Sequence, residues 1–161
     1  MPYTDFKNLP DESKTWVFAA NRPLTDKERE AVAREVPNFL SQWTAHGASV
    51  PASFEIRDER FLVVAADERV SPGGCSIDAL FRFVRALGDH LDVEMLDSGR
   101  VWYRDQAGEI RGADRPEFRN LAESGQVHEE TPVFDTSLDD LGTYRRSFEQ
   151  PARSSWTASM L

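Results

Sequence analysis

The run from Arg60 to Ala66 (RFLVVAA) constrains the fold of this chain more than any other feature. A strand with one face in water alternates apolar and polar side chains, whereas this run is apolar at nearly every position. We therefore predict a strand that is buried on both faces. The preceding stretch, Ser53 to Arg57 (SFEIR), does alternate, and only Asp58 and Glu59 separate the two. Together they predict a β-hairpin, although the usual Asn-Gly or Asp-Gly turn is missing.

A strand and a helix precede this hairpin. Thr15 to Ala20 (TWVFAA) is a short β-rich apolar run, and the next stretch, Thr25 to Glu28 (TDKE), has the pattern of a capping box at a helix start. Apolar residues then recur at three- and four-residue steps, and Gly47 is a natural stop. They are Val32, Val36, Phe39, Leu40 and Trp43. Pro37 lies inside this stripe, and we expect a kink or a break there.

A second helix and a second hairpin follow. The helix is predicted to begin with Ser76 as its cap and to end at Gly88. Its apolar stripe is Ile77, Leu80, Phe81, Val84 and Leu87. The hairpin joins residues 101–103 to residues 109–111. The order βαββαβ suggests a split βαβ unit, the ferredoxin-like arrangement in which two helices cover one face of an antiparallel sheet.

The other face of that sheet must also be covered, because the strand over 60–66 is apolar on both of its faces and presents side chains to it. The candidates are the C-terminal third of the chain or a second copy of the protein, which would associate through this apolar face. The C-terminal third predicts a helix from Asp114 to Gly125, an extended piece over 131–134 and another helix from Thr136. In the tail, Trp156 is the one large anchor.

These patterns predict a single domain over residues 1–161 of α/β (α+β) class. We expect a two-layer sandwich with an antiparallel or mixed sheet and helices on one face. Residues 1–14 read as a polar tail, 15–112 as the α/β core, and 113–161 as an α-rich C-terminal extension packed on it. Val, Leu, Ile and Phe together make up about 23% of the chain, above the roughly 20% below which a charged chain tends to stay disordered, so a packed core is expected.

Composition excludes several roles. The net charge of −9 and the scattered basic residues argue against a general nucleic-acid binder. No apolar run is long enough for membrane insertion, and the first residues lack a signal-peptide pattern, so we expect a cytoplasmic protein. The one cysteine excludes an intramolecular disulfide. No motif indicates a cofactor, and no ligand spacing indicates a metal, so we predict neither.

The scarcity of lysine excludes P-loop nucleotide hydrolysis. A Walker A loop needs a lysine that closes a glycine-rich turn. In this chain no lysine follows Lys27, and the first glycine is Gly47.

The turn before the second helix is the most suggestive stretch chemically. Cys75 stands at the predicted helix start, where unpaired N–H groups and the helix dipole favour a thiolate. In the split βαβ topology the end of the first helix lies beside this turn, which would bring His46 near as a base. Cys75 and His46 are therefore the candidate catalytic pair.

Two other interpretations of this turn stay open. Cys75 can be a small buried residue in a tight turn, with Ser76 as a cap and His46 as a cation at a helix C-terminus. Alternatively, the glycine-rich backbone binds an anion, although an acid in the first turn already occupies the helix dipole. The candidate ligand-binding residues are Gly73, Gly74, Ser76 and Asp78.

Several stretches resemble a family of small bacterial proteins of unknown function, over most of the chain beyond the first 15 residues. They are QWTAHG (42–47), SFEIRDERFLVVAADE (53–68), GCSID (74–78), EFRNLAESGQV (117–127) and PVFDT (132–136). Members often carry the label "ABC transporter ATPase", which the missing Walker A loop contradicts. The resemblance implies a discrete, stand-alone cytoplasmic protein and supplies no activity, cofactor or catalytic residue. In its tail the family has Asp-Ser-Trp-His where this chain has Ser-Ser-Trp-Thr (154–157), so a role for that histidine is not preserved.

Two functions of different classes follow. The favoured one is a non-enzymatic binding or regulatory module, because no complete catalytic motif is present and an apolar sheet face is left to cover. The alternative is a thiol-dependent enzyme that uses Cys75 with His46.

Overall fold

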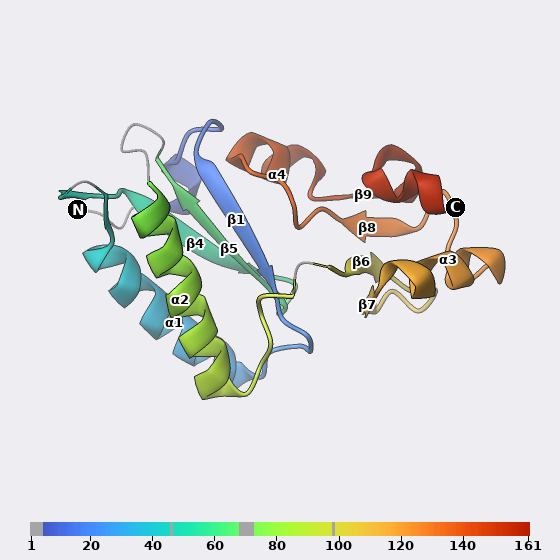
Figure 1. Cartoon of the computed structure of the whole chain (residues 1–161), viewed down its shortest axis with the longest axis horizontal. Helices are drawn as coiled ribbons and strands as arrows, with labels where there is room; N and C mark the ends of the chain where they lie inside the picture. Colours follow the sequence, from blue (N-terminus) through green and yellow to red (C-terminus); the bar gives the residue numbers. More distant parts are fainter. Residues whose placement is uncertain (1–4, 46, 68–72, 98) are drawn as a thin grey trace.

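The doubly apolar run forms the central strand of the first sheet. The computed structural model describes residues 5–45, 47–67, 73–97 and 99–161. In it β5 (Phe61–Ala66) lies between β1 (Lys14–Ala19) and β4 (Ala52–Arg57), and both neighbours pair with it antiparallel (Figure 1). All six residues of β5 are fully buried. The predicted hairpin, the doubly buried strand and the mixed α/β class are therefore confirmed.

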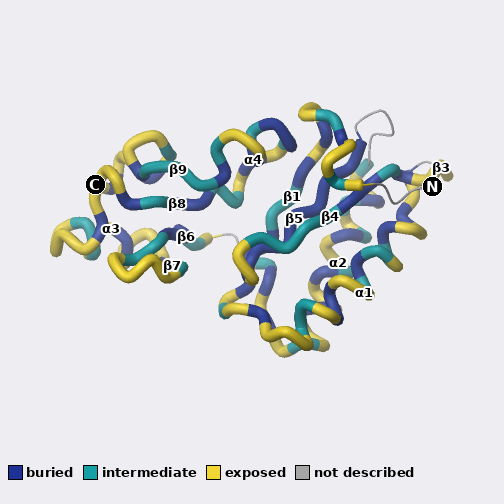
Figure 2. The backbone as a smooth tube through the Cα atoms, turned by 180° about the vertical axis from the view of Figure 1, so that it is seen from behind, coloured by how far each residue is buried: buried dark blue, intermediate teal, exposed yellow. Residues whose placement is uncertain are grey.

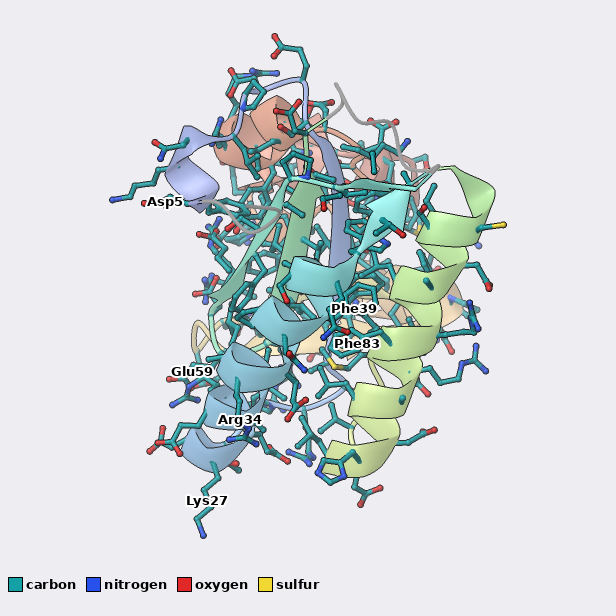
Figure 3. The ribbon with its side chains drawn as sticks, turned by 90° about the vertical axis from the view of Figure 1, so that its left-hand side faces the viewer. Asp5, Lys27, Arg34, Phe39, Glu59 and Phe83 are labelled. Carbon is teal, nitrogen blue, oxygen red and sulfur yellow. The ribbon has the colours of Figure 1, made fainter. Side chains whose placement is uncertain are left out.

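Two long helices cover one face of this sheet. They are α1 (Asp26–Gln42) and α2 (Gly74–Leu91), and both are buried on the side toward the sheet and exposed on the other (Figure 2). The capping box of Thr25 and Glu28 forms as predicted. Between the helices the rings of Phe39 and Phe83 stack with their centroids 4.4 Å apart (Figure 3). Pro37 does not break α1, which continues through it to Gln42.

Residues from the C-terminal half cover the other face. Phe134, Leu141 and Phe148 pack against β5 together with Leu9 and Trp102, and all of them are buried. The chain itself therefore supplies the cover that the sequence required. The predicted self-association through this face is not supported, because the protein's own side chains already occupy it.

A second antiparallel sheet forms in the C-terminal half. Its strand order is β7 (Ile110–Ala113), β6 (Val101–Arg104), β8 (Pro132–Phe134) and β9 (Glu149–Pro151). The helix α3 (Arg115–Glu123) packs on it, with Phe118 fully buried. The extension over 113–161 contains α3 and α4 (Leu141–Ser147), as predicted, and in addition it contributes the strands β8 and β9 to this sheet. The remaining elements are the short pair β2 (Thr44–Ala45) and β3 (Ala48–Ser49), and 3-10 turns at Phe6–Asn8, Ala152–Ser154 and Trp156–Met160.

The ferredoxin-like pattern is only partly realised. The strand order β1-β5-β4 with two helices on one face matches the first five elements of the split βαβ unit. The sixth element would pair with the free side of β1. Instead β6 pairs with β7 and β8, so its two sides are both occupied within the second sheet. Among the described residues, the first sheet therefore has no fourth strand beside β1.

Other expectations need correction. The last predicted helix begins at Leu141 and not at Thr136, because Asp140 supplies its cap by accepting a hydrogen bond from the N–H of Thr143. Trp156 is no buried anchor: 46% of it is exposed, and Arg115 stacks on its ring.

The second helix ends later than predicted. It continues past Gly88 to Leu91, and Asp92 adopts the left-handed conformation (φ 55°) that closes it. The N–H of Val93 then donates to the carbonyl of Gly88, at 2.8 Å. A Cβ at position 88 would lie 2.5 Å from the Val93 carbonyl oxygen. This glycine therefore allows the chain to fold back against the helix and does not end it.

Arg60 links the two sheets. Its side chain lies in the interior, with 8% of the residue exposed, and its N–H groups donate to the carbonyl oxygens of Ala20, Asn21 and Ile110. The guanidinium also lies over the ring of Trp102, 5.4 Å from its centroid. One side chain thus joins the central hairpin, the segment that follows β1, and β7.

Among the described residues, no helix is long and apolar enough to cross a membrane.

Candidate binding site

The free side of β1 is the most distinctive feature of the surface. In an antiparallel ladder, successive residues of a strand direct their N–H and C=O groups alternately toward the paired strand and away from it. Just after β1, the N–H of Ala20 donates to the carbonyl of Arg60 across this ladder, at 2.9 Å. Even-numbered residues therefore bond toward β5, and odd-numbered residues direct their backbone groups outward.

The two ends of this outer edge are occupied by the chain itself. At one end the N–H of Thr15 donates to the carbonyl of Asp139, at 3.1 Å. At the other end the N–H of Asn21 donates to the carbonyl of Glu94, at 2.9 Å. The segments that contain these acceptors, residues 136–139 and 93–97, lie where the ends of a fourth strand would be.

Between the two ends the edge is open. Val17 and Ala19 are the outward-directed residues there, and within the described part of the chain no backbone or side-chain group bonds to their N–H or C=O. Four backbone groups therefore stand unpaired in a row. Native proteins normally cover, shorten or charge such an edge, because it is a template for another strand. This stretch carries no charged side chain, since it reads Trp-Val-Phe-Ala.

A groove with a volume of about 290 Å³ runs along the open edge. We call it the edge groove and define it by β1, Phe81 of α2, residues 95–97 and residues 136–139. On the helix side its wall is apolar and consists of Phe18, Phe81, Met95 and Leu96. The opposite wall is largely polar, with Thr136, Ser137 and Asp139 around the buried Leu138.

Phe81 is exposed although it belongs to the predicted buried stripe of α2. Its stripe partners Leu80 and Val84 are buried, whereas 40% of Phe81 is exposed. Its ring meets the edge of the Phe18 ring, with centroids 5.4 Å apart. A fourth strand beside β1 would lie next to this ring. The absence of that strand therefore explains both the exposure of Phe81 and the unpaired edge.

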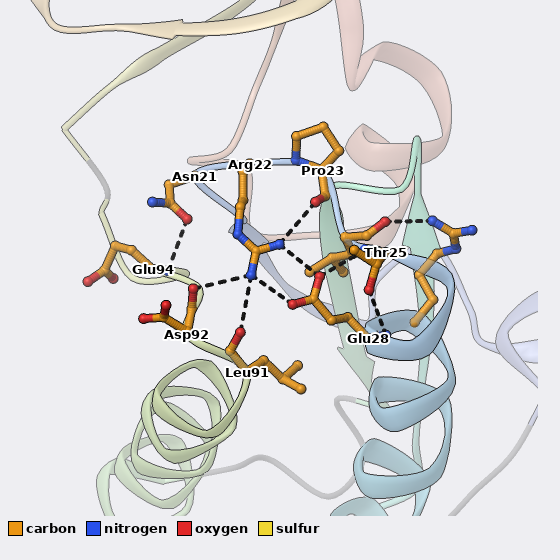
Figure 4. A network of polar contacts seen from close by, with 10 residues as sticks. Asn21, Arg22, Pro23, Thr25, Glu28, Leu91, Asp92 and Glu94 are labelled. Atoms are coloured by element: carbon orange, nitrogen blue, oxygen red, sulfur yellow. Dashed lines mark hydrogen bonds and ion pairs between the residues drawn. The ribbon is translucent and has the colours of Figure 1, made fainter.

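A polar network fixes the 93–97 end of the edge groove. The guanidinium of Arg22 donates to the carbonyls of Leu91 and Asp92 and to the carboxylate of Glu28 (Figure 4). Beside it, the amide oxygen of Asn21 accepts the N–H of Glu94, at 3.1 Å. A cation at the carbonyl end of α2 also opposes the negative end of the helix dipole.

Glu28 is the titratable group of this network. The hydrogen bonds from Arg22 and from the backbone N–H of Thr25 lower its pKa from 4.5 to about 2. The carboxylate is thus charged at any pH near neutrality and holds Arg22 toward the end of α2. The network joins the start of α1 to the end of α2.

The predicted site at the start of α2 is only partly visible. His46 lies outside the described residues, so its pairing with Cys75 stays a prediction. The two chain segments do meet: the Ser76 hydroxyl donates to the carbonyl of Thr44 at 2.6 Å, and the Trp43 indole donates to the carbonyl of Ser76 at 2.8 Å. Cys75 is exposed and lines a shallow cavity of about 400 Å³ beside Trp43. It is therefore not the buried filler of a tight turn.

The candidate ligand-binding residues of this turn serve α2 itself. Gly73 is the N-cap residue of α2 and has no side chain to accept a capping hydrogen bond. Gly74 is the first helical residue. Ser76 was predicted to be the cap, which is wrong. It lies in the first turn of α2, and its hydroxyl donates to the carbonyl of Thr44. Asp78 pairs with Arg82 one turn later, at 3.0 Å. Anion binding at this turn stays a prediction.

Within the residues that the structure describes, no three His, Cys, Asp or Glu side chains gather where they could hold a metal ion.

The sequence pointed to the start of α2 and missed the edge groove. The run Thr15 to Ala20 indicated a strand but not which of its sides stays unpaired. The unpaired side depends on a long-range fact that the run itself does not carry, which is that the strand over 101–104 pairs with β7 and β8 and not with β1.

The chain matches no protein-family model, no curated protein and no solved structure.

Proposed function

We propose that this chain is a binding protein that takes up an extended peptide segment along the outer edge of β1. The observation that carries the proposal is the pair Val17 and Ala19, whose outward N–H and C=O groups are unpaired inside a groove. An added strand is the ligand whose own backbone matches such a row of donors and acceptors. This proposal narrows the binding module that the sequence favours to one mode of recognition.

The edge groove suits a short segment better than a folded partner. Its volume of about 290 Å³ lies at the lower limit of ligand pockets. The chain itself occupies both ends of the edge, at Thr15 and at Asn21. These two positions are six residue steps apart, which is about 20 Å of extended chain. A bound segment would therefore pair over a few residues and leave the groove outward at both ends.

Selection of peptides tests the proposal. Proline at position 17 removes the outward N–H and places a ring carbon where the added strand would lie, while the ladder to β5 keeps all of its bonds. Val17→Thr keeps both the N–H and the branched shape and serves as the matched control.

A library of random heptapeptides displayed on phage is selected against the wild-type chain. We expect enriched peptides that bind the wild type and Val17→Thr alike and that fail to bind Val17→Pro. Circular dichroism on each variant confirms that it is folded. If no peptide is enriched, or if Val17→Pro binds the enriched peptides as well as the wild type, the proposal is wrong.

The thiol-enzyme alternative rests on Cys75 and His46, and its support among the described residues is limited to the contact between the segments around Thr44 and Ser76. The argument against P-loop ATP hydrolysis is still the scarcity of lysine, and the argument against general nucleic-acid binding is still the negative net charge.

A further inference from the structure

The two walls of the edge groove differ in polarity, and this difference bears on which peptides fit. The inference rests on the proposed function, because it concerns the occupant of the same groove. The side chains of an added strand point alternately to the two faces of the sheet. On the face of α2 they would meet Phe18, Phe81 and Met95. On the opposite face they would meet the wall formed by residues 136–139.

The apolar wall offers an anchor for one large side chain. Phe81 is exposed to 40%, although its stripe partner Leu80 is buried. An apolar side chain placed on the Phe81 ring would remove that ring from water, and burial of apolar area is the main source of affinity in a small groove. On the other wall Thr136 offers a hydroxyl group, and the Ser137 hydroxyl, which donates to the Asp135 carboxylate at 2.8 Å, can still accept a hydrogen bond. Both suit polar side chains.

Charge favours a cationic peptide over a second copy of the chain. The protein has a net charge of −9, so a second copy is repelled, whereas a basic peptide is attracted. At the rim of the groove, Asp97 already pairs with Arg100, at 3.0 Å. The carboxylate of Asp139 is exposed, and no described residue bonds to it or forms an ion pair with it. A basic side chain at that end of the peptide would lie beside this carboxylate, at an end of the groove that the exposed Lys14 also lines.

The shape of the edge also disfavours a folded second copy. Stable protein interfaces bury about 1,200–2,000 Å². The open stretch of edge comprises only Val17 and Ala19 as outward residues, between ends that the chain itself covers. The same recess on the second copy would keep its own β1 from reaching this one.

We infer that the edge groove recognises a basic peptide segment in which every second residue is a large apolar one. The apolar residues pack on Phe81 and Phe18, and the intervening residues face Thr136 and Ser137. A basic residue at one end lies beside Asp139. The backbone of the segment pairs with Val17 and Ala19.

Two synthetic peptides of equal composition test this inference. The first is a capped heptapeptide with lysine at both ends and leucine and threonine alternating between them, leucine at the second, fourth and sixth positions. The second has the same residues with the three leucines in one block. Fluorescence anisotropy measures the binding of each labelled peptide. We expect the alternating peptide to bind at least about tenfold more tightly, because only it directs all leucines to one face.

Matched variants locate the anchor. Phe81→Ala is expected to weaken binding of the alternating peptide on the order of tenfold. Leu161→Ala, at a comparably exposed residue (41%) outside the groove, leaves it unchanged. Asp139→Asn is expected to weaken it about twofold to fivefold at low salt, with less effect at high salt.

The outcomes separate the two proposals. If peptides bind in a way that Val17→Pro abolishes, but Phe81→Ala and the order of the leucines have no effect, the inference is wrong and the proposed function stands. If Val17→Pro has no effect on binding, the proposed function itself fails. Sedimentation velocity of the chain alone tests the second copy, because a dimer that Val17→Pro dissociates would overturn the assignment of a peptide.

Discussion

Replacing Arg60 by methionine tests how the two sheets are held together. Methionine keeps the apolar stem that packs on Trp102 and removes the three hydrogen bonds to the carbonyls of Ala20, Asn21 and Ile110. Each bond from a charged donor contributes about 1.5–3 kcal/mol, so the upper limit for three is about 5–9 kcal/mol.

The substitution also removes an unfavourable contribution to the free energy of folding, which offsets part of this loss. Burial, together with nearby Arg111, lowers the pKa of Arg60, which means that the charged guanidinium is held there at a cost. Removing a buried charge recovers its desolvation penalty. We therefore expect Arg60→Met to lower the free energy of unfolding by about 3–4 kcal/mol. For a chain of this size that corresponds to a fall in Tm of about 10 °C.

Urea denaturation followed by circular dichroism, with calorimetry for Tm, measures the effect. The control is Arg111→Met, because Arg111 lies on β7 with most of its side chain exposed and pairs with Asp105. An exposed ion pair contributes at most about 1 kcal/mol, so this variant should stay near the wild type. A loss below about 1 kcal/mol for Arg60→Met, or equal losses for both variants, would refute the role given to Arg60.

Two further predictions concern the ends of the long helices. Because the pKa of Glu28 is lowered from 4.5 to about 2, its contribution to stability is complete above pH 4.5 and is lost as the pH falls through 2. Acid denaturation should therefore show Glu28→Gln to be less stable than the wild type at pH 6, with the gap closing toward pH 2. The control Glu30→Gln, at an exposed residue of α1, should show no such gap. Gly88→Ala should destabilise by about 1–3 kcal/mol in urea, because the new Cβ meets the carbonyl oxygen of Val93 at 2.5 Å. Helix propensity alone predicts the opposite, namely that Gly88→Ala stabilises the protein by about 0.5–1 kcal/mol.

Local signals predicted much of the first sheet and its helices. The capping box at Thr25 and the cap at Asp114 both form, because a cap is decided by residues three positions apart. The doubly apolar run of β5 correctly implied a layer on each face. The hairpin before it forms without a glycine: Asp58 and Glu59 both adopt the left-handed conformation, with φ of 54° and 58°.

What the sequence missed depends on long-range pairing. The strand over 101–104 was assigned to the first sheet, and nothing local to it shows that residues about 30 positions further on will pair with it. That one choice leaves the outer side of β1 without a paired strand among the described residues and exposes Phe81. The edge groove therefore could not be predicted from local patterns, although residues 15–19 and Phe81, which line it, lie in elements that the sequence predicts.

Hydrogen exchange at the backbone amides of β1, read by NMR, tests the central claim most directly. In the free protein the amide of Val17 should exchange faster than that of Phe18, whose N–H is directed at β5. Saturating alternating peptide should slow exchange at Val17 and Ala19 by at least about tenfold and leave Phe18 unchanged. Equal protection of Val17 and Phe18 in the free protein, or exchange at Val17 and Ala19 that bound peptide does not slow, would contradict an open edge that receives a strand.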